Sequence, residues 1–377
     1  MKSVYLDNAA TTPLIPEVVE AMKDALLNSY GNPSSSHQVG RKSKALLESA
    51  RKSVASKFNV SSKEIIFTSS GTEANNLILY NAVQNYGVKR IITSRIEHHA
   101  VLHPCEHYEK QGLIQLDYVD VKEQGQIDLN HLEELLANSD EKTLVSLMLI
   151  NNEIGNRLPA QAVVDLCGKY KALFHSDTVQ VIGHYDLDLL KLPIDFITAS
   201  AHKFHGPKGV GFAYFKNGFT VKPMLFGGDQ EKGARSSTEN IPGIVGLEKA
   251  LNMALENVEK DHEYVEGLKA YFIEELQKLV PEIQFNGQSA DVTKSSYTIL
   301  NVRFPIKNTM FLFQLDMKGV AVSTGSACQS GASKVSHVLQ EFLNEDQQLL
   351  TSLRFSFSKF TTKEEIDFTL EKIKELL

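Results

Sequence analysis

Short apolar runs rich in β-branched residues alternate with longer helix-like stretches between about residue 60 and residue 215. The predicted strands are Glu64–Thr68, Arg90–Thr93, Ile114–Val119, Thr143–Ile150, Leu173–Ser176, Phe196–Ala199 and Val210–Phe215. The helices predicted between them are Thr72–Tyr86, Ala100–Lys110, Asp128–Ala137 and Pro159–Tyr170. This alternation predicts an α/β fold in which helices cover both faces of a seven-stranded, mostly parallel sheet.

The pattern changes after Pro242 and Gly243. Apolar residues with helical spacing predict one long amphipathic helix there: Val265, Leu268, Phe272, Leu276 and Leu279. The elements predicted further on are strands at Tyr297–Val302 and Leu353–Ser358 and helices at Asn308–Lys318 and Thr362–Leu377. We expect a large domain over residues 15–242 and a smaller α+β domain formed by residues 1–14 and 243–377, although periodicity alone does not place the first fifteen or so residues.

The composition is that of an ordinary globular enzyme. The 377 residues include 39 basic and 46 acidic side chains, a formal net charge of −7. This balance gives no basic surface for nucleic acid, so we expect no direct nucleic-acid partner. No apolar run approaches the roughly 18 residues that a membrane span needs. The first residues turn polar too soon for a signal peptide, and the expected location is therefore the cytoplasm, away from membranes.

Lys203 is the most informative single residue. It lies between two histidines, directly after an apolar run and before a Gly-Pro turn, in the segment Ser200–Gly209. Desolvation and neighbouring positive charge can lower the pKa of a lysine amine, which then becomes a nucleophile toward an aldehyde. A solvated surface lysine is the alternative for this residue alone. The presence of Asp177, Thr72 and Cys328 elsewhere in the chain favours the chemical interpretation.

Two further segments suit a phosphorylated cofactor. Ser70–Asn76 places small residues and a hydroxyl where a helix begins, which favours a monophosphate, with a plain N-cap role for Thr72 as the alternative. Asp177 follows an apolar strand, and a carboxylate there can keep the nitrogen of pyridoxal phosphate protonated, with a strand-end cap as the alternative. Asp177 and Lys203 are 26 positions apart, enough for one more strand, so they can approach opposite sides of one ring.

Four other residues are candidates for chemistry. His98 follows a strand and can stack on an aromatic cofactor or exchange protons near neutral pH. Asn152 caps another strand, where an amide can bind a cofactor oxygen or a substrate carboxylate. Arg354 lies inside an apolar run and needs an anionic partner, either in a salt bridge or as a clamp on an α-carboxylate. Cys328 lies among small residues, which indicates an exposed thiol that is available for reaction.

The cysteines and histidines do not predict a metal site. The three cysteines, Cys105, Cys167 and Cys328, are odd in number and widely spaced, which argues against both a disulfide framework and a CxxC site. His103 and His107 have the helical spacing of a metal-binding pair, but no third ligand lies in register. We therefore expect no metal.

Together these segments resemble the cysteine desulfurases of the NifS and IscS type, a group within the class V aminotransferases that has the type I pyridoxal-phosphate fold. The likeness covers nearly the whole chain. The segments that carry it are Tyr5–Pro13, Gly31–Ser35, Ser70–Asn76, Glu97–Ala100, Asn151–Gly155, Ala201–Gly209, Gly325–Cys328 and Leu353–Ser356. So many matches in the same order make the resemblance specific.

The resemblance implies how the cofactor, pyridoxal 5'-phosphate, would be held. Lys203 would form the imine with its aldehyde, while His98 would stack on the ring and Asp177 would pair with the pyridine nitrogen. The residues implied around the remaining oxygen atoms are Gln180 and Asn152 at the ring and Gly71, Thr72, Ser200 and His202 at the phosphate. Thr238 matches the threonine that reaches the phosphate of the neighbouring subunit, which implies a homodimer.

The implied reaction converts L-cysteine to L-alanine. Arg354 and Asn152 would clamp the substrate carboxylate, and Cys328, helped by His98, would capture the sulfur as a persulfide for a separate acceptor protein. The alternatives are a selenocysteine lyase, another class V aminotransferase and a non-catalytic scaffold. Transamination needs no thiol, so an aminotransferase would leave Cys328 without a purpose. Lys203, Asp177 and Cys328 argue against the scaffold. The destination of the sulfur stays open between iron–sulfur clusters, tRNA thiolation and a cofactor pathway.

Two positions depart from the family pattern. Asp229 and Ser237 stand where the resemblance leads us to expect glycine. If either position has a positive φ, a side chain there strains the loop that carries Thr238 and lowers the affinity for the cofactor.

Overall fold

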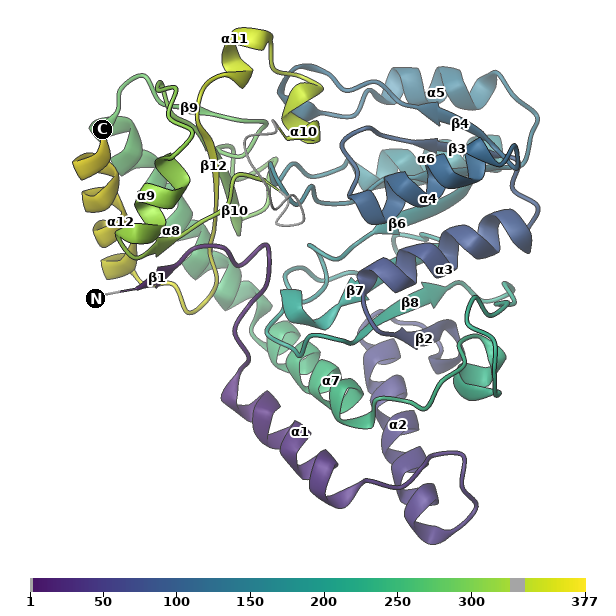
Figure 1. Ribbon diagram of the computed structural model, residues 1–377. Coiled ribbons are helices and arrows are strands. Elements are labelled where there is room, and N and C mark those ends of the chain that lie inside the picture. Colours follow the sequence, from purple (N-terminus) through teal and green to yellow (C-terminus); the bar gives the residue numbers. More distant parts are fainter. Residues whose placement is uncertain (1–2, 326–335) are drawn as a thin grey trace.

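Figure 1 shows the computed structural model of the chain, which describes residues 3–325 and 336–377. Its large sheet has the strand order β2-β8-β7-β6-β5-β3-β4. The strands are β2 (Ile65–Thr68), β3 (Arg90–Thr93), β4 (Gln115–Tyr118), β5 (Thr143–Ser146), β6 (Leu173–Asp177), β7 (Phe196–Ser200) and β8 (Gly211–Phe215). All pairs are parallel except those of β8, which runs antiparallel to both of its neighbours. The predicted seven-stranded, mostly parallel sheet is therefore confirmed.

Helices cover both faces of this sheet because its strands are apolar on both sides. On β5, for example, Leu144 packs in one hydrophobic core and Val145 in the opposite one. One face is covered by α3 (Gly71–Gln84) and α4 (His99–Lys110). The other face is covered by α2 (Gln38–Ser56), α5 (Leu129–Ala137), α6 (Ala160–Tyr170) and α7 (Ile241–Glu256), with α1 (Pro16–Asn28) packed against α7.

A smaller α+β unit lies beside the ends of the large-sheet strands and contains both described ends of the chain (Figure 1). Its antiparallel sheet consists of β12 (Ser352–Ser356), β10 (Ile299–Arg303) and β9 (Gln284–Phe285). The helices of this unit are α8 (Val258–Leu279), α9 (Phe311–Met317), α10 (His337–Gln340), α11 (Glu345–Gln348) and α12 (Lys363–Leu376). The predicted apolar face of α8 packs in a separate hydrophobic core within this smaller unit, called the second core below, where Phe272 contacts Phe355 with ring centroids 5.0 Å apart.

The first residues of the N-terminal segment pack in this smaller unit. β1 (Val4–Tyr5) pairs in parallel with β11 (Val320–Ala321), and Leu6 is buried in the second core. The predicted domain division stays a prediction. Because the buried face of α7 packs in the core of the large sheet, we propose that the boundary lies after α7 rather than at residues 242 and 243.

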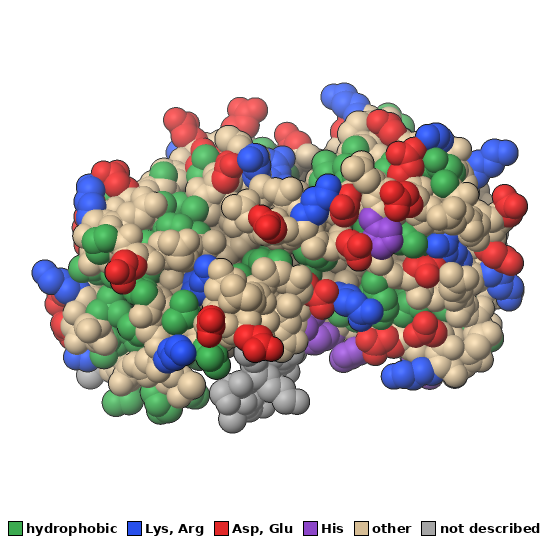
Figure 2. All heavy atoms as spheres, turned by 90° about the horizontal axis from the view of Figure 1, so that it is seen from above, with side chains coloured by type: hydrophobic (Ala, Val, Ile, Leu, Met, Phe, Trp, Pro, Cys, Tyr) green, Lys and Arg blue, Asp and Glu red, His purple; other side chains and the backbone are tan. Residues whose placement is uncertain are grey.

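The surface carries charges of both signs. Figure 2 shows acidic and basic side chains interspersed over the face seen from above. None of the helices in residues 3–325 and 336–377 has the length and apolar composition required to cross a bilayer.

Candidate active site

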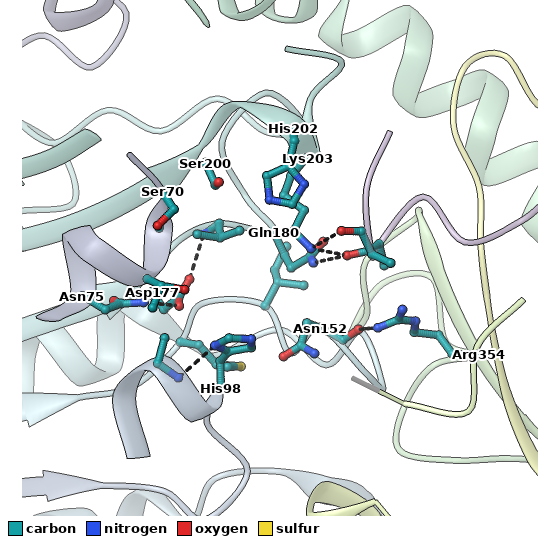
Figure 3. A pocket seen from close by; sticks show the side chains of 18 residues that line it. Ser70, Asn75, His98, Asn152, Asp177, Gln180, Ser200, His202, Lys203 and Arg354 are labelled. Carbon is teal, nitrogen blue, oxygen red and sulfur yellow. Dashed lines mark hydrogen bonds between the residues drawn. The ribbon is translucent and has the colours of Figure 1, made fainter. Parts of the chain in front are cut away.

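The carboxyl ends of several strands deliver the candidate residues to one cavity of about 210 Å³ (Figure 3). β6 ends at Asp177 and its parallel neighbour β7 ends at Ser200, so both ends lie at the same edge of the sheet. The 3₁₀ turn Ala201–Lys203 follows directly. The sequence-predicted residues that line this cavity are Gly71, Thr72, His98, Asn152, Asp177, Gln180, Ser200, His202, Lys203 and Arg354. Their individual roles remain predictions.

The amine of Lys203 is held against the N-terminal segment. Its Nζ donates to the carbonyl oxygen of Ala9 at 2.6 Å and to that of Ala10 at 2.8 Å. Gln180 Nε2 also donates to the Ala9 oxygen, at 3.0 Å. Main-chain oxygen atoms from the segment that periodicity could not place therefore form one wall of the cavity. Apolar spacing gives no signal for such a contact.

Asp177 is held by two hydrogen bonds beneath the cavity. Its Oδ2 accepts from Nδ2 of Asn75 at 2.7 Å, and its Oδ1 accepts from the main-chain N–H of Val179 at 3.0 Å. The Asp177 residue is only 7% exposed. Asn75 was not among the predicted site residues. Its position four residues after Gly71 places both on one face of α3, and this helical spacing is the signal that could have found it.

The N-terminus of α3 forms a cradle beside the lysine. The helix begins at Gly71, and Ser70 is its N-cap, accepting from the N–H of Glu73 at 3.2 Å, so the N-cap alternative for Thr72 is wrong. A Cβ atom at Gly71 would lie 2.6 Å from Cγ2 of Val179, which leaves no room for a larger residue. First-turn N–H groups lack partners inside a helix and favour an anion.

His98 caps α4 and faces the cavity. Its Nδ1 accepts from the N–H of Ala100 at 3.0 Å, and burial, helped by the charge of Lys203, lowers the pKa of the imidazole. The ring is therefore neutral near pH 7 and carries its proton on Nε2. Glu97 lies beneath it, where its Oε1 accepts from the N–H of Met148 at 2.7 Å and burial raises the pKa of the carboxyl well above its usual value.

Arg354 joins both chain ends at the opposite side of the cavity. It is 1% exposed, and its Nη2 donates to Oδ1 of Asp7 at 2.9 Å, while its Nη1 donates to the carbonyl oxygen of Asn152 at 2.8 Å. The predicted anionic partner is therefore Asp7. The buried Nε has no hydrogen-bond partner within the described part of the chain. The clamp on a substrate carboxylate stays a prediction.

Two predicted residues lie elsewhere. Thr238 is exposed and lines a second cavity of about 210 Å³ together with Arg235 and Ser69. The loop before it is tied to the start of α3, because Arg235 donates to both carboxylate oxygens of Glu73 at 2.8 and 3.3 Å. Cys328 lies outside the described residues.

One of the two departures from the family pattern requires a strained main chain. Ser237 has a φ of +116°, whereas Asp229 has an ordinary φ of −84°. A positive φ is costly for any residue with a Cβ atom, so the expected strain exists at Ser237 and not at Asp229.

Ser237→Gly is therefore expected to stabilise the folded protein by about 1 kcal/mol, the relief of strain less the extra entropy of glycine in the unfolded chain. The measurement is the unfolding free energy in urea. Ser236→Gly is the matched control, because it removes the hydrogen bond from Ser236 Oγ to the Gly228 oxygen (2.8 Å) at a position without positive φ. The strain argument fails if both variants are destabilised equally.

His175 makes the stability of the protein sensitive to acid. It lies on β6 with no exposed surface, its Nδ1 is 2.8 Å from Ser146 Oγ, and burial lowers its pKa to about 4. The unfolded value is about 6.5. The stability that the neutral ring contributes is therefore complete above pH 6.5 and is lost as the pH falls toward 4.

His175→Asn retains a polar group beside Ser146 but does not titrate in this range. The wild type should lose about 2 kcal/mol of unfolding free energy relative to this variant between pH 7 and pH 5. Denaturant titrations of both proteins at these two pH values measure the difference. A gap that stays constant with pH would show that His175 is not buried in its neutral form.

Comparison with known proteins agrees with this geometry. Residues 4–368 match the family described as aminotransferase class-V. A cysteine desulfurase IscS from Dictyoglomus turgidum is 40% identical over all of this chain and 95% of its own length, and a putative cysteine desulfurase IscS 1 from Bacillus subtilis is 39% identical over all of this chain and 99% of its own.

Two solved structures extend the comparison. A NifS-like protein superimposes with a TM-score of 0.91 at 36% identity and covers all of this chain and 99% of its own. A structure of SspA in complex with cysteine has a TM-score of 0.80 at 28% identity and covers 96% of this chain and all of its own.

Proposed function

The chain belongs to the aminotransferase class-V family as a cysteine desulfurase, and we propose that the cavity beside Lys203 is where it converts L-cysteine to L-alanine and from which sulfur passes to Cys328. The observation that carries this proposal is the convergence of Lys203 and Asp177 on one cavity from neighbouring parallel strands. L-Cysteine as substrate is supported by the relatives named above and by the cysteine complex of SspA.

The described residues suit pyridoxal 5'-phosphate as the cofactor. The N-terminus of α3, with Gly71 and Thr72, would hold the phosphate together with Ser200 and His202. At neutral pH His202 would do so as a neutral donor, because burial and the charges of two lysines lower its pKa to about 4. When bound, this cofactor supplies an electron sink for the α-carbon of an amino acid.

The side chains around the ring have separate tasks. Asp177, oriented by Asn75, would keep the pyridine nitrogen protonated, and Gln180 and Asn152 would contact ring oxygens. Lys203 would anchor the cofactor and then carry the proton taken from the substrate α-carbon. The neutral ring of His98, with its proton on Nε2, would stack on the cofactor and exchange a proton with the substrate thiol.

Cys328 would receive the sulfur. In this step its thiolate would attack the substrate sulfur and form a persulfide, while the bond from that sulfur to Cβ breaks and its electron pair stays on the substrate, where Cβ takes up a proton to give alanine. Cys105 and Cys167 are poor candidates, because both are buried, and burial raises the pKa of Cys167 to about 12 and that of Cys105 further.

Arg354 would bind the substrate carboxylate with Asn152. Since Nη2 already donates to Asp7 and Nη1 to the Asn152 oxygen, the substrate would meet Nε–H and the second N–H of Nη1 or Nη2, or would displace Asp7. Either arrangement would hold the substrate carboxylate at the Arg354 side of the cavity that Lys203 also lines.

We further propose a homodimer that acts in the cytoplasm. The exposed position of Thr238 leaves it available to reach the phosphate of a second subunit. The thiols of Cys105 and Cys167 are free, as in proteins of a reducing compartment. A separate acceptor protein would take the sulfur from Cys328.

The test is to add L-cysteine to the protein loaded with pyridoxal phosphate and to measure alanine, sulfide and cofactor absorbance. Cys328→Ala should abolish sulfide release while the absorbance of the bound cofactor persists, and Cys167→Ala is the control that should retain activity. Undiminished turnover by Cys328→Ala would refute the persulfide step. Transamination without sulfide release by the wild type would refute the desulfurase assignment.

A further inference from the structure

A histidine from another loop contacts the main chain of Lys203 from behind the cavity. His184 Nε2 lies 3.0 Å from the carbonyl oxygen of Lys203. The residue before it, Gly183, has a φ of +82°, and a Cβ atom there would lie 2.3 Å from Cβ of Phe204. Only glycine lets the two loops approach so closely, and this approach brings the imidazole to the lysine turn.

The tautomer of His184 follows from its partner. A carbonyl oxygen can only accept, so the proton must be on Nε2. Burial lowers the pKa of His184 to about 4, so near pH 7 the ring is neutral and Nδ1 is an acceptor. The hydroxyl of Tyr297 lies 3.4 Å from this Nδ1 and 3.1 Å from the main-chain oxygen of His184, and it can donate to either.

Tyr297 connects this contact to the smaller unit. Its ring is buried in the second hydrophobic core and stacks on His262 of α8 with centroids 4.2 Å apart. Its main-chain N–H donates to the hydroxyl of Tyr185 at 3.2 Å. A continuous set of hydrogen bonds and ring contacts therefore leads from the smaller unit through His184 to the main chain of Lys203.

The lysine turn is held from the other side as well. The Oγ1 of Thr12 donates to the carbonyl oxygen of His202 at 2.9 Å and accepts from the N–H of His205 at 2.7 Å. His205 has a left-handed φ of +65°, so this turn is not a conformation that the chain adopts without support.

We propose that His184 is a positioning residue for Lys203, held in its tautomer and orientation by Tyr297 of the smaller unit. It does not touch the reacting atoms. It fixes the main chain from which the lysine amine reaches the cavity, and this inference rests on the proposed function of Lys203 as the cofactor anchor. The N–H donor of His184 matters because, without it, the carbonyl oxygen of Lys203 would lose this hydrogen bond inside the protein, which would destabilise the lysine turn.

Three variants test the proposal in the full-length protein. His184→Leu removes the donor at similar volume, His184→Gln returns an amide N–H at the reach of Nε2, and Tyr297→Phe removes one hydroxyl while the ring packing remains. His184→Leu should weaken pyridoxal phosphate binding to the cofactor-free protein about tenfold, the effect of one lost buried hydrogen bond. It should also speed amide exchange at Phe204 and His205 by a similar factor.

Turnover should show the same order. His184→Leu should lower kcat with little change of KM for L-cysteine, because Arg354 is not altered. His184→Gln should recover most of the lost kcat and most of the lost cofactor affinity. Tyr297→Phe should give a smaller effect of the same kind, about two- to threefold in cofactor affinity.

Borohydride reduction separates this proposal from the proposed function. A pyridoxyl group on Lys203 in the wild type supports the anchor role, and its absence there would refute that role and this inference together. If Lys203 is labelled but His184→Leu binds the cofactor as tightly as the wild type, positioning by His184 is refuted. Equal losses in His184→Gln and His184→Leu would refute the hydrogen bond as its cause. Should His184→Leu fail to fold, an unchanged cofactor affinity in Tyr297→Phe would refute the support from the smaller unit.

Discussion

Replacing Lys203 by alanine is expected to reduce the conversion of L-cysteine to L-alanine by at least about 10⁴-fold. The substitution removes the amine that would anchor the cofactor and carry the α-proton. The two carbonyl oxygens of Ala9 and Ala10, now without this donor, remain at the cavity wall. The measurements are alanine formation and pyridoxal phosphate content after gel filtration.

Two controls define what the loss means. Lys203→Arg retains a positive charge but has no nucleophilic free base near neutral pH, so it should be as inactive as Lys203→Ala. Lys191→Ala should behave like the wild type, because that side chain is 85% exposed and is not among the residues that line the cavity. If Lys203→Ala keeps more than a few per cent of the turnover, another lysine is the anchor and the assignment is wrong.

The sheet could be predicted because its signal is local. Most strands of the large sheet are short apolar runs, the edge strand β4 being the most polar, and the seven predicted runs coincide with the seven strands within a few residues. The position of the site followed from one rule, that the carboxyl ends of parallel strands meet at one edge. Asp177 and Lys203 therefore lie at one cavity although 26 positions separate them.

The contacts of the N-terminal segment could not be predicted in the same way. β1 pairs with β11, and Val4 lies opposite Val320, so the partner is almost a full chain length away. Ala9 and Ala10 contribute only main-chain oxygen atoms, which every residue has. Sequence patterns record side chains, and such contacts leave no trace in them.

His184 was missed for a related reason. No motif marks His184 among the twelve histidines of the chain, because its partner is a carbonyl group in another loop. The close approach required Gly183, and the importance of a glycine becomes visible only when its φ and its neighbours are known. The sequence therefore predicts which residues carry the chemistry more readily than which residues hold them in place.

The largest effect on stability is expected from Glu231→Ala, which should lower the unfolding free energy by about 3–5 kcal/mol. Arg51 and Glu231 are 1% and 5% exposed and form a two-point ion pair, with Nη1 to Oε2 at 2.6 Å and Nη2 to Oε1 at 2.8 Å. Glu231 Oε2 also accepts from the N–H of Phe67 on β2 at 2.8 Å. The alanine variant would leave a buried guanidinium and a strand N–H without this partner.

The consequence should extend to the loop that carries Thr238. Glu231 lies on the same segment as Ser237, and its ion pair ties that segment to α2, as the pair of Arg235 and Glu73 ties it to α3. Glu231→Ala should therefore weaken cofactor binding in the dimer, and the loss of affinity should be larger than the loss of folding stability alone would explain. Urea denaturation and a cofactor titration on the same preparations measure the two effects.

Charge and shape can be separated with matched variants. Glu231→Gln keeps an acceptor for the N–H of Phe67 and should therefore lose less stability than Glu231→Ala. Combining it with Arg51→Met removes both charges. The double variant should recover part of the stability lost in Glu231→Gln, since no buried charge remains unpaired. Glu133→Ala, which breaks an exposed pair with Lys169, should change stability little. A loss in Glu231→Ala no larger than that in Glu133→Ala would contradict the buried ion pair as the anchor of this segment.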